Sequence, residues 1–146
     1  MWKQPIGLGP DAGASNLEWG LAASPLIVDD KVIVLPGGRG GKSVAAYEKV
    51  SGAQVWSALD DPQAYTSPML VTLGGVRQIL VVSAKRAMGL TADRGRLLWE
   101  HPWVTEFGIN VSQPLLLGND RVFLRPATNA EKSLGISSLR PPRSLR

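Results

Sequence analysis

The 146 residues suffice for one domain with a real hydrophobic core, and a composition that is 44% hydrophobic and 19% charged excludes a disordered chain. Sixteen Gly and eleven Pro favour an all-β fold with many tight turns over a helical bundle. The net charge is +4, but residues 1–126 carry 12 Lys or Arg against 11 Asp or Glu and are therefore nearly neutral. Since these residues show no basic face, the sequence argues against nucleic-acid binding.

In chain order, the sequence predicts short strands bounded by Gly, Pro or Asp. The first four lie near residues 22–28, 31–36, 43–48 and 53–58, and the next four near 66–72, 76–83, 86–91 and 96–101. A third set begins at 111–117 and 121–125. These runs are rich in β-branched residues and too short for stable helices. Hairpin turns are predicted at 28–31, 73–76 and 117–121, where Gly, Asn and Asp tolerate positive φ.

An internal repeat connects these strands. Gly52 and Trp56 recur 43 residues later as Gly95 and Trp99. Three prolines that each precede an apolar run follow a similar period: Pro25, Pro68 and Pro114. Four short antiparallel strands repeated every 40–50 residues are typical of β-propeller blades.

Residues 46–56 and 89–99, which contain these Gly and Trp residues, resemble the tryptophan-docking motif of β-propellers of the pyrroloquinoline-quinone (PQQ) type. This family includes propellers like outer-membrane assembly factor B and like the quinoprotein dehydrogenases. In the family the Gly permits a turn and the Trp ring packs between neighbouring blades. The resemblance therefore implies a structural, blade-docking role for Gly52, Trp56, Gly95 and Trp99.

Both copies depart from the family motif at its Asp and Thr positions. The motif runs approximately Ala-x-Asp-x-x-Thr-Gly-x-x-x-Trp. Its Asp is replaced by Glu48 and Thr91, and its Thr by Ser51 and Arg94.

The predicted architecture is a partial β-propeller with about 2.5 four-stranded blades. The propeller covers residues 1–126, with blades near 20–60, 63–103 and 108–126, a leading strand near Trp2 and a loop at residues 5–18. Residues 127–146 are predicted as an irregular basic tail. Because propellers generally close with about four to eight blades, we expect a fragment of a longer protein or a chain that associates with itself.

Three groups of residues invite a chemical interpretation. Residues 37–43 approach the phosphate-binding P-loop pattern, although Pro36 stands where that pattern requires Gly, and a glycine-rich hairpin loop is favoured. His101 is the only histidine and is expected in a surface or loop position. The pairs Asp29-Asp30 and Asp60-Asp61 could bind Ca²⁺ or transfer protons, but turn positions favour local hydrogen bonding.

No catalytic, cofactor-binding or metal-binding residue is predicted, and the sequence favours a non-catalytic scaffold or interaction module of a bacterial protein. Its expected partners are the remaining blades of a longer protein, a second copy or other proteins. One alternative is a fragment of a PQQ-dependent alcohol or sugar dehydrogenase, which would use PQQ and Ca²⁺; another is nucleotide binding by residues 37–43.

Three further features bear on compartment and cofactors. The sequence has no Cys, so disulfides and thiolate metal sites are excluded. It has no apolar stretch long enough for a membrane-spanning helix and no recognisable signal peptide. The family resemblance implies the periplasm or cell envelope.

Overall fold

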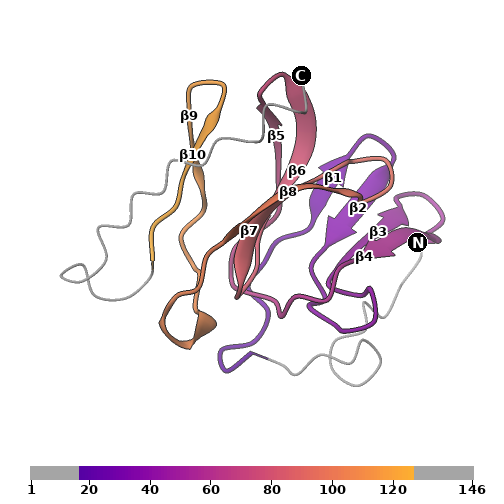
Figure 1. The fold of residues 1–146 in the computed structure, drawn as a ribbon. Helices are drawn as coiled ribbons and strands as arrows, with labels where there is room; N and C mark the ends of the chain where they lie inside the picture. Colours follow the sequence, from indigo (N-terminus) through magenta and orange to yellow (C-terminus); the bar gives the residue numbers. More distant parts are fainter. Residues whose placement is uncertain (1–16, 127–146) are drawn as a thin grey trace.

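The computed structural model describes residues 17–126, which form three antiparallel sheets (Figure 1). The first blade has the strand order β1-β2-β3-β4 and the second the order β5-β6-β7-β8, and β9 pairs with β10 in the third sheet. The bounds are β1 Leu26–Val28, β2 Lys31–Val34, β3 Val44–Glu48, β4 Gln54–Ala58, β5 Met69–Leu73, β6 Val76–Val82, β7 Arg86–Leu90, β8 Leu97–Pro102, β9 Leu115–Leu117 and β10 Arg121–Phe123.

The predicted hairpin turns are confirmed, and the strands are mostly shorter than expected. Val28 pairs with Lys31, Leu73 with Val76, and Leu117 with Arg121. The first strand of each repeat begins only after its proline, because Pro lacks the N–H that a strand ladder needs. A single 3₁₀ turn, η2 (Glu106–Gly108), interrupts the connection between β8 and β9.

Two apolar clusters hold the three sheets side by side (Figure 1). In the first, the face of the first blade that carries Trp56 packs against Ile79, Val81, Met88 and Leu90 of the second blade. In the second, the opposite face of the second blade, which carries Trp99, packs against Val122 and Leu124 at the third sheet. Each complete blade is therefore covered by apolar contacts to its neighbour, as expected for a partial β-propeller.

Some predictions fall beyond the described residues. These are the strand near Trp2, most of the loop at 5–18, and the tail at 127–146. Within residues 17–126, no helix is long and apolar enough to cross a membrane.

Candidate functional site

The seam between the first two blades is built around the ring of Trp56. Trp56 lies on β4 and is 9% exposed. Gly95, in the turn between β7 and β8, lies directly against this ring: a Cβ added to Gly95 would come 2.5 Å from Cε3 and 2.6 Å from Cζ3. The structure thus brings together the Trp of one repeat and the Gly of the next. That the four motif residues dock the blades in solution stays a prediction, which the variants below test.

The motif glycines close equivalent turns in the two blades. Gly52 has φ +74° and its N–H donates to Glu48 O at 2.8 Å. Gly95 has φ +63°, and its N–H donates to Thr91 O at 3.0 Å. These left-handed conformations favour glycine because a side chain there meets its own backbone.

The departures from the family motif still supply hydrogen bonds to these turns. The Glu48 carboxylate accepts the N–H groups of Val50 at 3.0 Å and Ser51 at 2.5 Å. Thr91 Oγ1 accepts the N–H of Arg96 at 3.2 Å. Glu48 thus bonds the N–H groups two and three residues on, as turn carboxylates do, whereas Thr91 bonds across the turn to a residue five positions on.

Because the amide of Ser51 and the other turn donors hold the pKa of Glu48 below its ordinary value of 4.5, folding stability depends on pH here. The lowered pKa stabilises the fold above about pH 4.5, and this contribution is lost as pH falls through the folded-state pKa. We expect Glu48→Gln to lower the midpoint of urea unfolding at pH 7 and to lower it less at pH 3, because protonation of Glu48 removes part of this contribution. Glu106→Gln removes the same charge from the η2 loop and serves as the control. An equal deficit for Glu48→Gln at both pH values would contradict this role.

Trp99 is anchored differently from Trp56. Its Nε1 donates to Gln78 Oε1 at 2.5 Å, whereas Trp56 Nε1 is buried without a hydrogen-bond partner among the described residues. Gly89 makes room for this bond: a Cβ there would lie 2.1 Å from Gln78 Oε1 and 2.2 Å from Trp99 Nε1. Sequence reasoning missed Gln78 and Gly89, although a Gly within an apolar strand is a signal of close approach.

A ladder of hydrogen bonds links the residues that precede the three repeat prolines. The N–H of Ser24 donates to Ser67 Oγ at 2.8 Å. The N–H of Ser67 in turn donates to Gln113 Oε1 at 3.0 Å. The residue before a repeat proline thus donates its backbone N–H to a side chain of the next repeat. Its own side chain accepts the N–H from the preceding repeat, which explains why this residue is polar.

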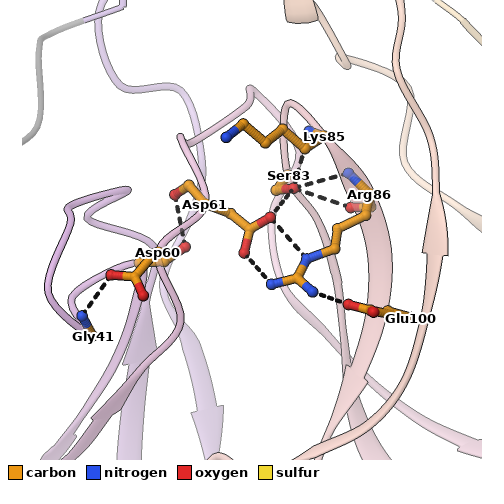
Figure 2. A network of polar contacts seen from close by, with 8 residues as sticks. Gly41, Asp60, Asp61, Ser83, Lys85, Arg86 and Glu100 are labelled. Carbon is orange, nitrogen blue, oxygen red and sulfur yellow. Dashed lines mark hydrogen bonds and ion pairs between the residues drawn. The ribbon is translucent and has the colours of Figure 1, made fainter.

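A partly buried ion pair joins the segment between the blades to the start of β7 (Figure 2). Asp61 is 4% exposed and accepts from Arg86 Nε at 2.9 Å and Nη2 at 2.6 Å. Ser83 Oγ donates to the same carboxylate at 3.2 Å, and Arg86 Nη1 also contacts Glu100. The hydrogen bonds from Arg86 to Asp61 raise the pKa of the guanidinium above its ordinary value. All of these charges are held by protein partners.

This network corrects the expectation of local turn chemistry for Asp60-Asp61. Asp61 binds a residue 25 positions away, and Asp60 accepts the N–H of Gly41, 19 positions away, at 2.8 Å. The prediction was wrong because exposed turns and linkers that pack against the next blade are both polar in sequence. The sequence alone therefore does not distinguish them.

The other acidic pair does lie in a turn, as predicted, but it also reaches the second blade. Asp29 has φ 55° in the β1–β2 turn, and its carboxylate accepts two bonds of 2.9 Å from Arg77 on β6. Asp30 pairs with Lys31 beside it. Arg77 is the main reason that the pKa of Asp29 lies below its ordinary value.

Residues 37–43 form the glycine-rich hairpin loop between β2 and β3. The N–H groups of Gly37 and Gly38 donate to the carbonyls of Ser43 and Lys42, both at 3.1 Å, and Gly41 donates to Asp60. The element that follows is the antiparallel strand β3. The structure therefore contradicts the strand-to-helix setting that a phosphate-binding P-loop requires.

His101 lies on strand β8, opposite Ala87, and is half-buried. It is thus partly exposed on the edge strand of the second blade, within the strand predicted at 96–101, and does not lie in a loop. Within residues 17–126, no three His, Asp or Glu side chains gather in a way that would hold a metal ion.

The loop after β8 presents Phe107 on a left-handed backbone. Phe107 is 84% exposed and has φ 59°, which costs a non-Gly residue about 1–2 kcal/mol. The loop is held by Thr105 Oγ1, which donates to Ile109 O at 2.8 Å, and by buried Asn110, whose Nδ2 donates to Ser83 O at 2.9 Å. The exposed ring contributes little burial to offset the strain.

We expect Phe107→Asn to stabilise the chain by about 0.5–1 kcal/mol, since Asn adopts positive φ more readily. Val104→Asn is the matched control, because Val104 is 76% exposed on the same loop without positive φ. Urea denaturation measures both variants. A loss of stability in Phe107→Asn would show that the ring contributes to folding.

Comparison with known proteins gives a family and matches to 25 solved chains. Residues 9–132 match the family model described as "Outer membrane protein assembly factor BamB". Among solved structures the chain is similar to BamB from Moraxella catarrhalis, with 18% sequence identity and a TM-score of 0.49. That match covers 72% of this chain but only 30% of the length of the other. No curated protein matches the sequence.

Proposed function

The chain belongs to the family of outer membrane protein assembly factor BamB, and from this membership we propose that it is a non-catalytic β-propeller module that binds other proteins. In this proposal it is part of a longer propeller, works in the periplasm or cell envelope, and contributes to outer membrane protein assembly. It uses neither PQQ nor Ca²⁺.

The proposal rests on one observation: the polar side chains between the blades are bound to one another. Asp61, the most deeply buried carboxylate of the described residues, is held by the guanidinium of Arg86 and by Ser83. Such a neutralised carboxylate is a poor ligand for Ca²⁺, which takes 6–8 oxygen ligands. The polar groups at the seam therefore support a rigid scaffold rather than a reaction.

The motif geometry supports the same proposal. Trp56 packs on Gly95 of the next repeat, and the Ser24–Ser67–Gln113 ladder joins equivalent positions. Repeat proteins in which each unit contacts its neighbour present extended surfaces on which partners bind.

The alternative is a fragment of a PQQ-dependent alcohol or sugar dehydrogenase. It is tested with the purified chain, and with its longer parent, by adding PQQ and Ca²⁺ and following the reduction of an electron-accepting dye. We expect no turnover above a sample without protein. Turnover that requires both PQQ and the protein would overturn the non-catalytic proposal.

Protein binding is tested in bacterial cells that express the tagged full chain. We expect cross-linking to recover an identified component of the outer membrane protein assembly machinery. The destabilised variant Gly95→Ala, expressed at a matched level, is expected to lose it. Equal recovery by the folded chain and the variant, or no recovery of such a component, would contradict the proposal.

A further inference from the structure

Two short turns share one tripeptide pattern, a glutamate followed by an aromatic residue and a glycine. They are Glu18-Trp19-Gly20, before β1, and Glu106-Phe107-Gly108, which is η2. In each turn the glycine has positive φ, +74° and +68°. Its N–H donates to the carbonyl three residues earlier, at 2.9 Å in the first turn and 3.0 Å in the second. The two turns are therefore closed by the same hydrogen bond and carry their aromatic residue at the same position.

Both aromatic rings are exposed at the same end of the molecule (Figure 1). Trp19 is 65% and Phe107 is 84% exposed. The ring of Trp19 packs on that of Tyr65, with centroids 5.8 Å apart, and the N–H of Tyr65 donates to Asn110 O at 3.0 Å, just beyond η2. Tyr65 thus contacts the segments that carry both turns. We call the surface formed by Trp19, Tyr65 and Phe107 the aromatic end.

The connection that carries η2 is longer than its counterpart in the preceding repeat. Eleven residues separate Trp56 from Pro68, whereas 14 separate Trp99 from Pro114. Several side chains of the shorter connection are buried. The longer connection contains the three residues of η2 and presents Phe107 to solvent. The additional length therefore serves exposure of this ring rather than the path between the blades.

The conformation of Phe107 favours the same interpretation. In a turn of this kind, the position before the last residue accepts positive φ most readily when it is Gly or Asn. Strained residues of this type cluster where proteins bind their ligands. A buried aromatic ring removes about 150–250 Å² from water, and binding to another molecule would supply the burial that the chain itself does not give Phe107.

Each turn also carries one negative charge. Glu18 and Glu106 are exposed, and neither forms an ion pair with another of the described residues. Residues 17–23 and 103–113 contain no Lys or Arg. A wholly apolar partner would desolvate both carboxylates without compensation, which is costly. The partner that fits the aromatic end therefore combines apolar side chains with Lys or Arg beside them.

Further blades of a longer propeller do not compete for this surface. The blades of this chain join through the faces of their sheets, where the two apolar clusters lie. Neither turn is part of a sheet. A partner on the aromatic end is therefore compatible with a longer propeller.

We propose that the aromatic end docks a segment of a protein partner in which apolar side chains are flanked by Lys or Arg. The rings of Trp19 and Phe107 fill apolar sites of this segment, and Glu18 and Glu106 pair with its basic groups. The inference rests on the proposed function, because it locates the surface through which the module binds other proteins.

The test is photo-cross-linking in bacterial cells that express the full chain. The photoreactive aromatic amino acid p-benzoylphenylalanine replaces Trp19, Phe107 or Val50, and mass spectrometry identifies the cross-linked peptides. Val50 is the matched control, since it is 75% exposed between β3 and β4. We expect both turns to cross-link to one partner, at peptides with Lys or Arg beside apolar residues, and the control to give no such product.

Variants separate binding from folding. Phe107→Asn is expected to stabilise the chain, so a loss of binding in this variant does not come from unfolding. We expect it to lower recovery of the cross-linked partner about tenfold or more, as for the loss of a central aromatic contact. Glu106→Lys should also lower recovery, because it places like charges together. Val50→Asn should leave recovery unchanged.

The inference is wrong unless both turns cross-link above the Val50 control. It is also wrong if the cross-linked peptides lack Lys and Arg, or if Phe107→Asn and Glu106→Lys both leave recovery unchanged. Failure of the proposed function gives a different result. Recovery of an assembly-machinery component that cross-links only elsewhere on the chain refutes this inference alone. Cross-links from both turns to a basic segment of a protein outside that machinery refute only the proposed role in outer membrane protein assembly.

Discussion

Gly95→Ala should destabilise the chain by about 2–5 kcal/mol, the sum of a strained left-handed Ala and an overpacked seam. The new Cβ would come within 2.6 Å of two ring carbons of Trp56. Contacts this close force the ring or the β7–β8 turn to move, and both are packed at the interface between the blades. Urea or thermal unfolding of the purified variant measures the effect.

Gly74→Ala is the matched control. Gly74 also has positive φ, +58°, but a Cβ there meets nothing within 4 Å. Its cost should therefore be the backbone strain alone, about 1–2 kcal/mol.

A double-mutant cycle isolates the contact itself. With Trp56→Leu in the background, the cost of Gly95→Ala should fall to that of the control, because the ring is gone. An unchanged cost would show that Trp56 and Gly95 do not act as a docking pair.

Asp61→Ala should cost about 2–4 kcal/mol, since it removes the carboxylate that accepts two hydrogen bonds from the partly buried guanidinium of Arg86. Asp61 is almost fully buried, whereas the Arg86 side chain is 26% exposed and keeps its contact with Glu100. These two facts place the expected loss below that of a fully enclosed pair. The free energy of unfolding from denaturant titration at pH 7 measures it.

Asp60→Ala provides the comparison within the same dipeptide. Asp60 is exposed and accepts one bond, from Gly41, so its loss should cost less than about 1 kcal/mol. Similar costs for the two variants would show that the Asp61–Arg86 pair adds nothing to the stability of the inter-blade segment.

The repeat made the fold predictable from the sequence. The 43-residue offset between Trp56 and Trp99 identified the blade unit, and runs of β-branched residues bounded by turn residues located the strands. These signals are local: each can be read within one repeat. They carry no information about which side chain of one repeat meets which of the next.

The ion pairs between repeats were accordingly missed. Asp61 and Arg86 lie 25 positions apart, and Asp29 and Arg77 lie 48 apart. A carboxylate in a turn-like sequence gives no sign of a tertiary partner, because partner choice depends on how two sheets stack. Gly89 was the one position where the sequence held a signal, a Gly in an apolar strand that makes room for Gln78 and Trp99.

The hydrogen-bond ladder between repeats has a direction, with consequences for synthesis on the ribosome. Ser24 donates its N–H to the side chain of Ser67, which is synthesised 43 residues later. Ser67 in turn donates to Gln113, which is synthesised 46 residues later. Trp56 likewise lacks its packing partner until Gly95 has emerged. Each blade can therefore form its own sheet as it appears but reaches its final packing only when the next has been translated. We expect nascent chains stalled before residue 67 to be more sensitive to protease than those stalled after residue 113.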